Sequence, residues 1–495
     1  MKLVILVSLL LSFFACSAFA ILSPGYGVGA TTYDWLSNGS MKKTVCLDAQ
    51  HGVHVIWTYR IMADQNSRRA YYNFRDETGA WAFVHSGVPV SPDTARYPVL
   101  SLLSDGRLVA AFNCSNWGFV VYVGNSRCVF QGALRWPGLA VGGYDVIHVF
   151  ASSLTDSDHY YSRSTDLGQN WSPWTLLCDN GLSEGFFAMA ARGSKVAVVW
   201  PDSLDNDVWL RESADDGVTW GGIARIHHRD SHRGGLWQDA VYSPAGELHV
   251  VYDVRDTSSG STRAQIRHWS PSGVYLVRNG DWDSRPGANH GTVACPQLGY
   301  DAGNNTWWCT WVEFTMADTS IFGFSNGEVW AAYSTDNGRT WRGHRSITNS
   351  PTPGAPPGLC ADDRYASLAA VVDDTLRVLY LSSFDAGSAT YGEGTLTVDT
   401  MRYYQIPTDS ILGVEEQASS LVTGREVFLS VFPNPFASFA AVLGHETESF
   451  ELYDIAGRRV GICPGARIGQ DLAPGVYFLR PVAGRAALTR IVKVR

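Results

Sequence analysis

Charge is scarce in this sequence. Asp, Glu, Lys and Arg make up 17% of its 495 residues, and the formal net charge is -9. No run of Lys or Arg is long enough to follow a phosphate backbone, so nucleic acid is not expected as a partner. Beyond the N-terminus, no apolar run reaches the roughly 18 residues that a membrane-spanning helix needs. We therefore expect no transmembrane segment.

Glycine and aromatic residues are abundant instead, with 49 Gly, 18 Trp, 22 Tyr and 21 Phe. This balance is typical of short β-strands joined by tight turns. The pattern Ser-x-Asp-x-Gly-x-x-Trp also closes three segments in which apolar and polar residues alternate. In such a pattern the Ser and Asp side chains can bond the backbone of their own turn, and the Gly can adopt a positive φ. The three copies, each predicted to be a β-hairpin turn, are Ser164 to Trp171, Ser213 to Trp220 and Ser334 to Trp341.

Seven apolar segments recur at spacings of about 50 residues, the period of a four-stranded propeller blade. The sequence therefore predicts an all-β fold, a seven-bladed β-propeller over residues 42–407. Each segment is predicted to be the second strand of its blade. The segments are Val53 to Tyr59, Leu108 to Phe112, Val146 to Phe150, Val196 to Trp200, Leu248 to Tyr252, Trp307 to Val312 and Leu376 to Leu381.

The N-terminus has the three regions of a secretory signal peptide, predicted over residues 1–20: Met1-Lys2-Leu3, an apolar run through Phe14, and Ala18-Phe19-Ala20. Export permits disulfides. Two cysteine pairs flank strands that are predicted to be adjacent and antiparallel, so cross-strand bridges are plausible for them. These pairs are Cys114 with Cys128 and Cys295 with Cys309.

The composition changes after Pro407, and the change predicts a linker over residues 408–424 followed by a small β-rich domain over residues 425–495. Its landmarks are Phe432-Pro433-Asn434-Pro435-Phe436, Glu451 to Arg458, Leu472 to Phe478 and Lys493-Val494-Arg495. In these motifs the domain resembles the type A C-terminal sorting domain of the type IX secretion system, a β-sandwich. The resemblance implies the type IX secretion machinery as a partner and a protein that is secreted or held at the outer-membrane cell surface.

Polar residues gather where first strands are predicted to begin and second strands to end. In a propeller these positions converge at one mouth of the central channel. Several arginines there favour a ligand that carries a carboxylate, sulfate or phosphate, although local ion pairs such as Arg255 with Asp253 would neutralise them. The residues are Arg60, Arg96, Glu184, Asp202, Asp239, Asp253, Arg255, His290, Glu313, Arg364, Tyr365 and Asp385.

Three of these segments resemble sialidases, the Asp-box glycoside hydrolases. Arg96-Tyr97-Pro98 is similar to the family's Arg-Ile-Pro motif, Tyr365-Ala366-Ser367-Leu368 to the segment of its nucleophilic tyrosine, and Gln238 to Arg255 to the segment of its glutamate. The resemblance implies Tyr365 as nucleophile and Arg96 and Arg255 as carboxylate-binding residues.

The sequence also departs from the sialidase pattern. Asp239 stands at the base position in place of Glu, and only Glu313 offers a substitute. The third arginine has no clear match, although Arg364 and Arg285 are available. No Asp matches the family's acid/base, and sialidases have six blades, the number obtained when blades are counted from Arg96.

Three functions follow as alternatives. The sharpest is sialidase-like hydrolysis that releases a terminal acidic sugar, with Tyr365, Asp239 and Glu313 as catalytic residues and Arg96, Arg255 and Arg364 binding the substrate. The second is a non-catalytic surface module that binds glycans or proteins. The third is another glycoside hydrolase that uses two carboxylates such as Asp239 and Glu313. In each case we expect a monomer that acts on or binds extracellular glycans and requires no metal or cofactor.

Overall fold

The computed structural model describes residues 23–61, 64–91, 94–114, 118–182, 184–412, 431–442, 445–454, 458–482 and 489–494. The chain divides into two compact units, Met1–Glu416 and Gln417–Arg495. The predicted signal peptide and residues 413–424 of the predicted linker lie outside the described residues. No helix in the described ranges is long and apolar enough to cross a membrane.

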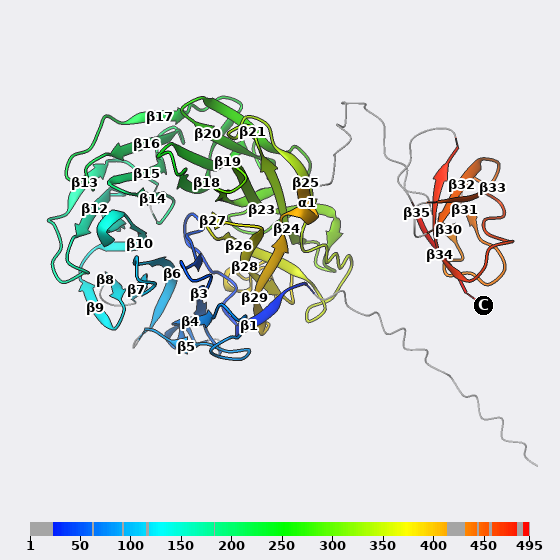
Figure 1. The fold of residues 1–495 in the computed structure, drawn as a ribbon, viewed down its shortest axis with the longest axis horizontal. Coiled ribbons are helices and arrows are strands. Elements are labelled where there is room, and N and C mark those ends of the chain that lie inside the picture. Colours follow the sequence, from blue (N-terminus) through cyan, green and yellow to red (C-terminus); the bar gives the residue numbers. More distant parts are fainter. Residues whose placement is uncertain are drawn as a thin grey trace, which may run out of the picture. The chain divides into compact units, whose positions relative to one another are not determined.

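In the described part of the first unit, the strands pair into seven sheets arranged as a ring (Figure 1). The prediction of an all-β propeller is confirmed. Sheet 1 contains β2 (Val45–Leu47), β3 (Val53–Tyr59), β4 (Arg69–Arg75) and β5 (Val88–Pro89). Sheet 2 contains β6 (Ala95–Leu102), β7 (Leu108–Cys114), β8 (Gly118–Val123) and β9 (Ser126–Phe130). Sheet 3 contains β10 (Leu134–Val141), β11 (Ile147–Ser153), β12 (His159–Ser164) and β13 (Thr175–Cys178).

The remaining sheets follow in chain order. Sheet 4 contains β14 (Ala188–Arg192), β15 (Lys195–Pro201), β16 (Val208–Ser213) and β17 (Ala224–His227). Sheet 5 contains β18 (His232–Tyr242), β19 (Leu248–Asp256), β20 (Ala264–Ser270) and β21 (Gly273–Gly280). Sheet 6 contains β22 (Val293–Asp301), β23 (Thr306–Thr319), β24 (Ser325–Ser334), β25 (Arg342–Ser346) and the short β27 (Val371–Val372). Sheet 7 contains β26 (Asp362–Leu368), β28 (Thr375–Ser383), β29 (Asp399–Pro407) and β1 (Tyr26–Thr31), and the helix α1 (Asp409–Leu412) follows it.

β1 corrects the predicted start of the propeller at residue 42. It pairs antiparallel with β29, from Tyr26 opposite Tyr403 to Thr31 opposite Asp399. The C-terminal part of the ring supplies only three of the four strands of sheet 7, which would leave the outer edge of β29 unpaired. An exposed strand edge is a liability, and the N-terminal strand covers it. The two ends of the propeller are thereby joined in one sheet.

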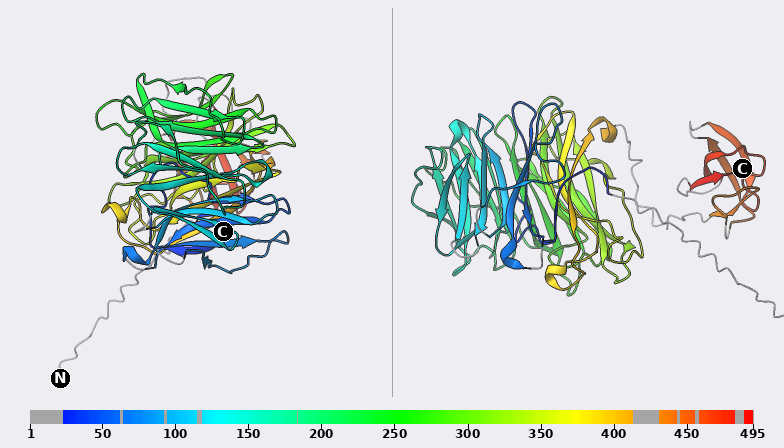
Figure 2. Two further views of the ribbon diagram at one scale, coloured as in Figure 1. Left: turned by 90° about the vertical axis from the view of Figure 1, so that its left-hand side faces the viewer. Right: turned by 90° about the horizontal axis from the view of Figure 1, so that it is seen from below.

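The first strands of neighbouring sheets lie next to one another around the ring axis. Each runs from one face of the ring to the other, as the edge-on view in the right panel of Figure 2 shows. We call the face where first strands begin, near Arg96, the entry face. The strands of a sheet alternate in direction, so the turns between third and fourth strands lie on the opposite face. These turns include the three Ser-x-Asp-x-Gly-x-x-Trp turns. We call this second face the box face.

The Ser213 to Trp220 turn has the hydrogen bonds expected from its sequence. The Ser213 hydroxyl donates to Asp215 at 2.7 Å and accepts from the Gly217 amide at 2.9 Å. Asp215 in turn accepts from the Thr219 amide at 2.8 Å. Gly217 has a φ of 77°, and a Cβ at this position would lie 1.9 Å from the Tyr161 hydroxyl of sheet 3. The turn therefore holds neighbouring sheets close together.

The predicted disulfides are wrong. Cys295 and Cys309 are free thiols, and Cys295 lies in a bulge of β22 while Cys309 pairs with Leu298. Cys114 and Cys128 lie on β7 and β9, and β8 separates these strands. The sequence spacing was read as one hairpin, whereas in sheet 2 it spans two.

The second unit has two sheets in its described residues. One pairs β30 (Val431–Phe432) with β31 (Ala441–Val442). The other has the order β33 (Arg459–Pro464), β32 (Ser449–Asp454), β34 (Gly475–Pro481) and β35 (Thr489–Lys493). Phe436, Phe450, Leu452 and Leu479 form its core. All four landmarks of the sequence analysis overlap these strands, and two of them supply the core residues Phe436 and Leu452. The role of this unit as a sorting domain stays a prediction.

Ring closure buries the carboxyl group of Asp363, which lies on β26 and is fully buried. Burial raises its pKa to about 7, against hydrogen bonds from Ser23 and Ser350 that favour the charged form. The folded state therefore binds this proton more tightly than the unfolded chain, where the pKa is about 4. The stability from this proton is present at low pH and is lost as pH rises toward about 7.

We expect the melting temperature to fall between about pH 5 and pH 8, and Asp363→Asn to reduce that fall because Asn carries no proton to lose. Thermal melts at both pH values test this. The matched control is Asp374→Asn, at an exposed position. An equal pH dependence in wild type and Asp363→Asn would contradict this account of sheet 7.

Candidate functional site

A repeated kink interrupts the first strands near the entry face. Bulges occur in β6, β10, β22 and β26, and each contains a residue of positive φ. Proline follows three of these residues, and because it has no N–H it cannot continue the ladder of hydrogen bonds. The four residues are Tyr97 at 56°, Trp136 at 50°, Cys295 at 54° and Tyr365 at 53°.

The segment from Thr32 to Lys43 crosses the ring from sheet 7 to sheet 1. Near its start, Asp34 accepts a hydrogen bond from the Thr390 hydroxyl at 2.5 Å. In its second half, Ser40 donates to Gln238 of sheet 5 at 2.5 Å, and the Lys42 ammonium donates to the Gly185 carbonyl beside sheet 4 at 2.8 Å. Because it contacts opposite sides of the ring, this crossing segment closes the entry-face end of the channel.

Tyr365, the predicted nucleophile, lies beneath the crossing segment and is 1% exposed. Its ring centre is 6.4 Å from that of Trp35, 6.2 Å from Trp237 and 5.2 Å from His290. Burial raises the pKa of Tyr365 well above its usual value of 10, and the charge of Arg364 only partly opposes this. The phenol is therefore protonated and shielded from solvent at neutral pH.

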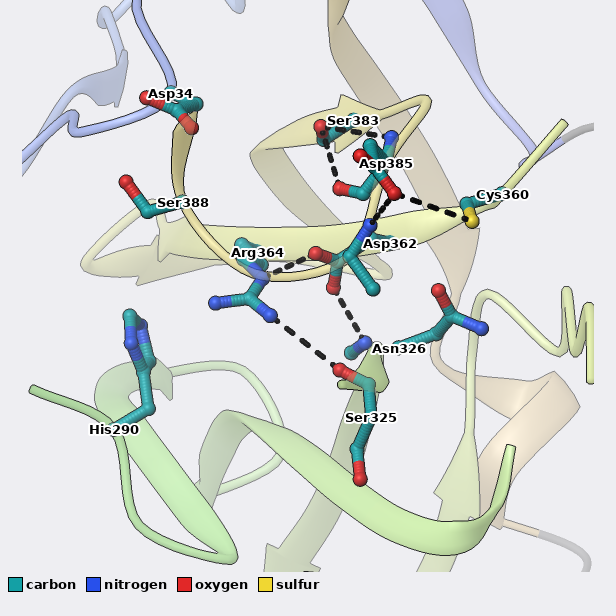
Figure 3. A network of polar contacts seen from close by, with 12 residues as sticks. Asp34, His290, Ser325, Asn326, Cys360, Asp362, Arg364, Ser383, Asp385 and Ser388 are labelled. Carbon is teal, nitrogen blue, oxygen red and sulfur yellow. Dashed lines mark hydrogen bonds and ion pairs between the residues drawn. The ribbon is translucent and has the colours of Figure 1, made fainter. Parts of the chain in front are cut away.

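Arg364 and Arg255 both lie near His290, but each is held by an acid of its own strand. The Arg364 Nε donates to Asp362 Oδ2 at 2.5 Å, and its other end reaches the Ser325 carbonyl at 3.4 Å (Figure 3). The Arg255 Nε donates to Asp253 Oδ2 at 3.2 Å. These local ion pairs, an alternative that the sequence left open, neutralise both guanidinium groups.

His290 completes this buried cluster. Burial lowers its pKa well below 6.5, and the positive charges of Arg364 and Arg255 lower it further. The imidazole is therefore neutral at neutral pH. Its Nδ1 is 2.9 Å from the Ala288 carbonyl, so this nitrogen carries the proton as a donor.

Asp239 and Glu313 are each bound by a cation. Asp239 Oδ2 is 2.6 Å from the Lys43 ammonium and accepts from the Leu298 amide at 2.7 Å. Glu313 forms a two-point ion pair with Arg278 at 2.9 and 3.0 Å. A cation thus compensates the charge of each carboxylate, and no contact of either with Tyr365 is found among the described residues.

Arg96 differs from the other predicted arginines. It is half-buried, and its guanidinium lies 5.2 Å from the centre of the Tyr97 ring. No hydrogen bond or ion pair to this guanidinium is found among the described residues. Arg135 is close by. Its pKa is lowered mainly by burial and, to a smaller extent, by the positive charge of Arg96. Two neighbouring cations that form no ion pair with a carboxylate among the described residues favour the approach of an anion.

Tyr33 of the crossing segment extends this arrangement. Its hydroxyl is 2.9 Å from that of Tyr97, and the guanidinium groups of Arg60 and Arg68 lie 5.0 and 5.2 Å from its ring centre. Glu184 lies near Arg96. Burial raises the pKa of this half-buried carboxyl, and a hydrogen bond from Asn38 and the charge of Arg96 oppose the rise. Aromatic rings, cations and one acid thus share this part of the entry face.

A cavity formed by loops of the entry face has a volume of about 500 Å³. Arg285 and Glu393 line it with Phe324. The Arg285 guanidinium lies 3.9 Å from the Phe324 ring centre, and Glu393 accepts from the Ala288 amide at 3.0 Å. Arg285, the alternative third arginine of the sequence analysis, therefore faces a cavity, in contrast to Arg364.

Sequence reasoning missed two features that carry a signal. Arg135-Trp136-Pro137 repeats the order Arg, aromatic, Pro of Arg96-Tyr97-Pro98, and the structure places both tripeptides in the same kind of bulge. The crossing segment was left outside the propeller because it has no strand periodicity. Its Tyr33, Asp34 and Trp35 nevertheless form a polar and aromatic cluster that is unusual for a linker.

No protein-family model and no curated protein matches the chain. Among solved structures, a PL25 ulvan lyase is 11% identical with a TM-score of 0.47, covering 78% of this chain and 96% of its own. An α-L-arabinofuranosidase of Fusarium graminearum is 12% identical with a TM-score of 0.44, covering 79% and 99%. A Hadza microbial sialidase is 15% identical with a TM-score of 0.39, covering 78% and 69%. At these identities the similarities assign no role to any residue of this chain.

The Arg364–Asp362 pair gives a stability prediction. Arg364→Ala would leave a buried carboxylate without its cation, so we expect it to lower the free energy of unfolding by about 3 to 5 kcal/mol. Urea denaturation measures this loss. The control is Arg342→Ala, at an exposed position, where we expect a change within about 0.5 kcal/mol. Equal effects of the two substitutions would show that the pair does not stabilise the ring.

Proposed function

We propose that this protein is a glycan-directed β-propeller that binds an acidic sugar on its entry face through Arg96 and Arg135. The observation that carries the proposal is the Arg96 guanidinium, which is half-buried and forms no hydrogen bond or ion pair among the described residues, although its charge acts on the nearby Glu184 carboxyl. Such a group gains a charge-assisted, two-point hydrogen bond when a carboxylate or sulfate binds. Arg255 and Arg364 would gain less binding energy from an anion, because they already form ion pairs with Asp253 and Asp362.

The neighbouring side chains suit a sugar ring. Tyr97 and Trp136 are half-buried and occupy equivalent bulges, so their rings offer apolar faces on which the C–H groups of a sugar can stack. Glu184 can accept a hydrogen bond from a sugar hydroxyl. An acidic monosaccharide presents one anionic group, one apolar face and several hydroxyls. This combination supports a glycan over a peptide as the ligand.

Sialidase-like hydrolysis is the second candidate, favoured by the position of Tyr365 beside Arg364 and His290. A phenol needs a neighbouring base to act as a nucleophile at neutral pH. Asp239 and Glu313 are engaged by Lys43 and Arg278. The geometry therefore supports binding at the half-exposed Arg96 better than hydrolysis at the buried Tyr365.

The proposal also includes export of the protein from the cell. The N-terminal residues 1–20 and the landmarks of residues 425–495 support a protein that is secreted or held at the outer-membrane cell surface by the type IX machinery. Extracellular glycans are abundant in both places. The expectation of a monomer stands with this proposal.

Binding is tested by titrating the protein with 3′-sialyllactose and, as a neutral control, with lactose in a calorimeter. We expect 3′-sialyllactose to bind more tightly, and Arg96→Ala to weaken it about 10- to 100-fold through loss of a charged hydrogen bond. Arg96→Lys should recover part of the affinity, because Lys keeps the charge without the planar fork. Unchanged affinity in Arg96→Ala, or equal binding of lactose, would contradict the proposed site.

Hydrolysis is tested separately with a fluorogenic sialic acid glycoside. We expect no release above background, because Trp35 packs against the buried Tyr365 and the neighbouring imidazole of His290, whose pKa burial lowers well below 6.5, is a weak base. Release that Tyr365→Phe abolishes would establish the tyrosine mechanism instead. Circular dichroism of Tyr365→Phe would confirm that the variant is folded.

A further inference from the structure

A cavity of about 500 Å³ lies on the ring axis and opens on the box face. Its walls are the ends of the first strands, which contribute mainly apolar side chains. The lining residues include the buried Val241, the half-exposed Leu102, Val141 and Met189, and the exposed Val371. The volume is in the range of small-molecule sites, which is about 300 to 1,000 Å³.

The inner end of this axial cavity is closed by Lys43. The Lys43 ammonium donates to Asp239 at 2.6 Å, to the Leu298 carbonyl at 2.8 Å and to the Leu368 carbonyl at 3.0 Å. An ammonium group has three donors, and all three are engaged. The Lys43 ammonium therefore has no spare donor for a ligand. Sugar hydroxyls would gain no hydrogen bond from it, and the mainly apolar lining favours an apolar group over carbohydrate.

The charged side chains that line the cavity have one sign among the described residues. Lys43 and Arg192 line it, and none of the described lining residues is Asp or Glu. Asp239 compensates Lys43, whereas Arg192 is exposed at the end of β14, and no hydrogen bond or ion pair to its guanidinium is found among the described residues. An anionic group would thus be attracted to the mouth of the cavity and not to its inner end.

We propose that the axial cavity binds an amphiphile with an apolar body and one carboxylate, such as a medium-chain fatty acid. The acyl chain lies along the apolar walls, where burial of each CH₂ contributes about 0.8 kcal/mol. The carboxylate remains at the mouth and pairs with Arg192. This site lies on the box face and is independent of the sugar site at Arg96.

The test is a titration of the protein with decanoate, decanol and decyltrimethylammonium, each below its micelle concentration. We expect decanoate to bind with a stoichiometry of one, more tightly than decanol, and the cationic amphiphile most weakly. Arg192→Ala should weaken decanoate about three- to tenfold and leave decanol unchanged, because only the carboxylate contacts this guanidinium. Equal affinities for the three probes would overturn the assigned polarity.

A second variant separates the cavity from general surface binding. Ala191→Trp places an indole in the axial cavity and should abolish binding, whereas Val218→Trp, at a position 61% exposed on the same face, should have no effect. Melting temperatures show whether both variants are folded. Decanoate binding that survives in a folded Ala191→Trp variant, or that has several equivalents, would overturn the proposal. The proposal would also be overturned if the protein formed dimers that Ala191→Trp disrupts, because a second copy of the chain would then occupy the cavity.

Discussion

The Lys43 ammonium lies inside the ring near its axis, and its hydrogen bonds join three sheets that are distant in sequence. Asp239 of sheet 5, the Leu298 carbonyl of sheet 6 and the Leu368 carbonyl of sheet 7 all accept from it. Lys42 does the same toward sheet 4 through the Gly185 carbonyl. A buried cation without such partners would be costly, so these contacts fix the crossing segment. With the segment fixed, the entry-face end of the channel is closed and the axial cavity on the box face has an inner end.

The polar residues of the entry face fall into two groups, those that form an ion pair and those that do not. Arg364 and Arg255 have buried acids beside them, and Asp239 and Glu313 have cations, so these four side chains act in the structure of the ring. Among the described residues, Arg96 forms no hydrogen bond or ion pair, its charge acts on the nearby Glu184 carboxyl, and Arg135 adds a second positive charge. The difference between paired and unpaired charges, more than the residue types themselves, is the basis for proposing an anionic sugar as the ligand at Arg96.

The fold was largely predictable because its signals are local. The Ser213 to Trp220 turn contains its own hydrogen bonds, and the apolar second strands repeat at a regular spacing. Pairing of β1 with β29 was not predictable in the same way, since it joins residues at opposite ends of the ring. The contacts of the candidate site residues were less predictable for the same reason. Arg96 stands out in the sequence through its tripeptide Arg96-Tyr97-Pro98. The cation that binds Asp239 is Lys43, which is distant in the chain, so no local pattern predicts that contact.

Hydrogen exchange with and without 3′-sialyllactose tests the central claim most directly, because it locates the ligand without any substitution. The account predicts slower exchange of backbone amides in β6 and β10 near Arg96 and Arg135, with little change around the axial cavity. Protection confined to β26 near Tyr365 would contradict it, since that result would place the sugar in the cluster whose charges are already paired. Protection on the box face alone would contradict it as well.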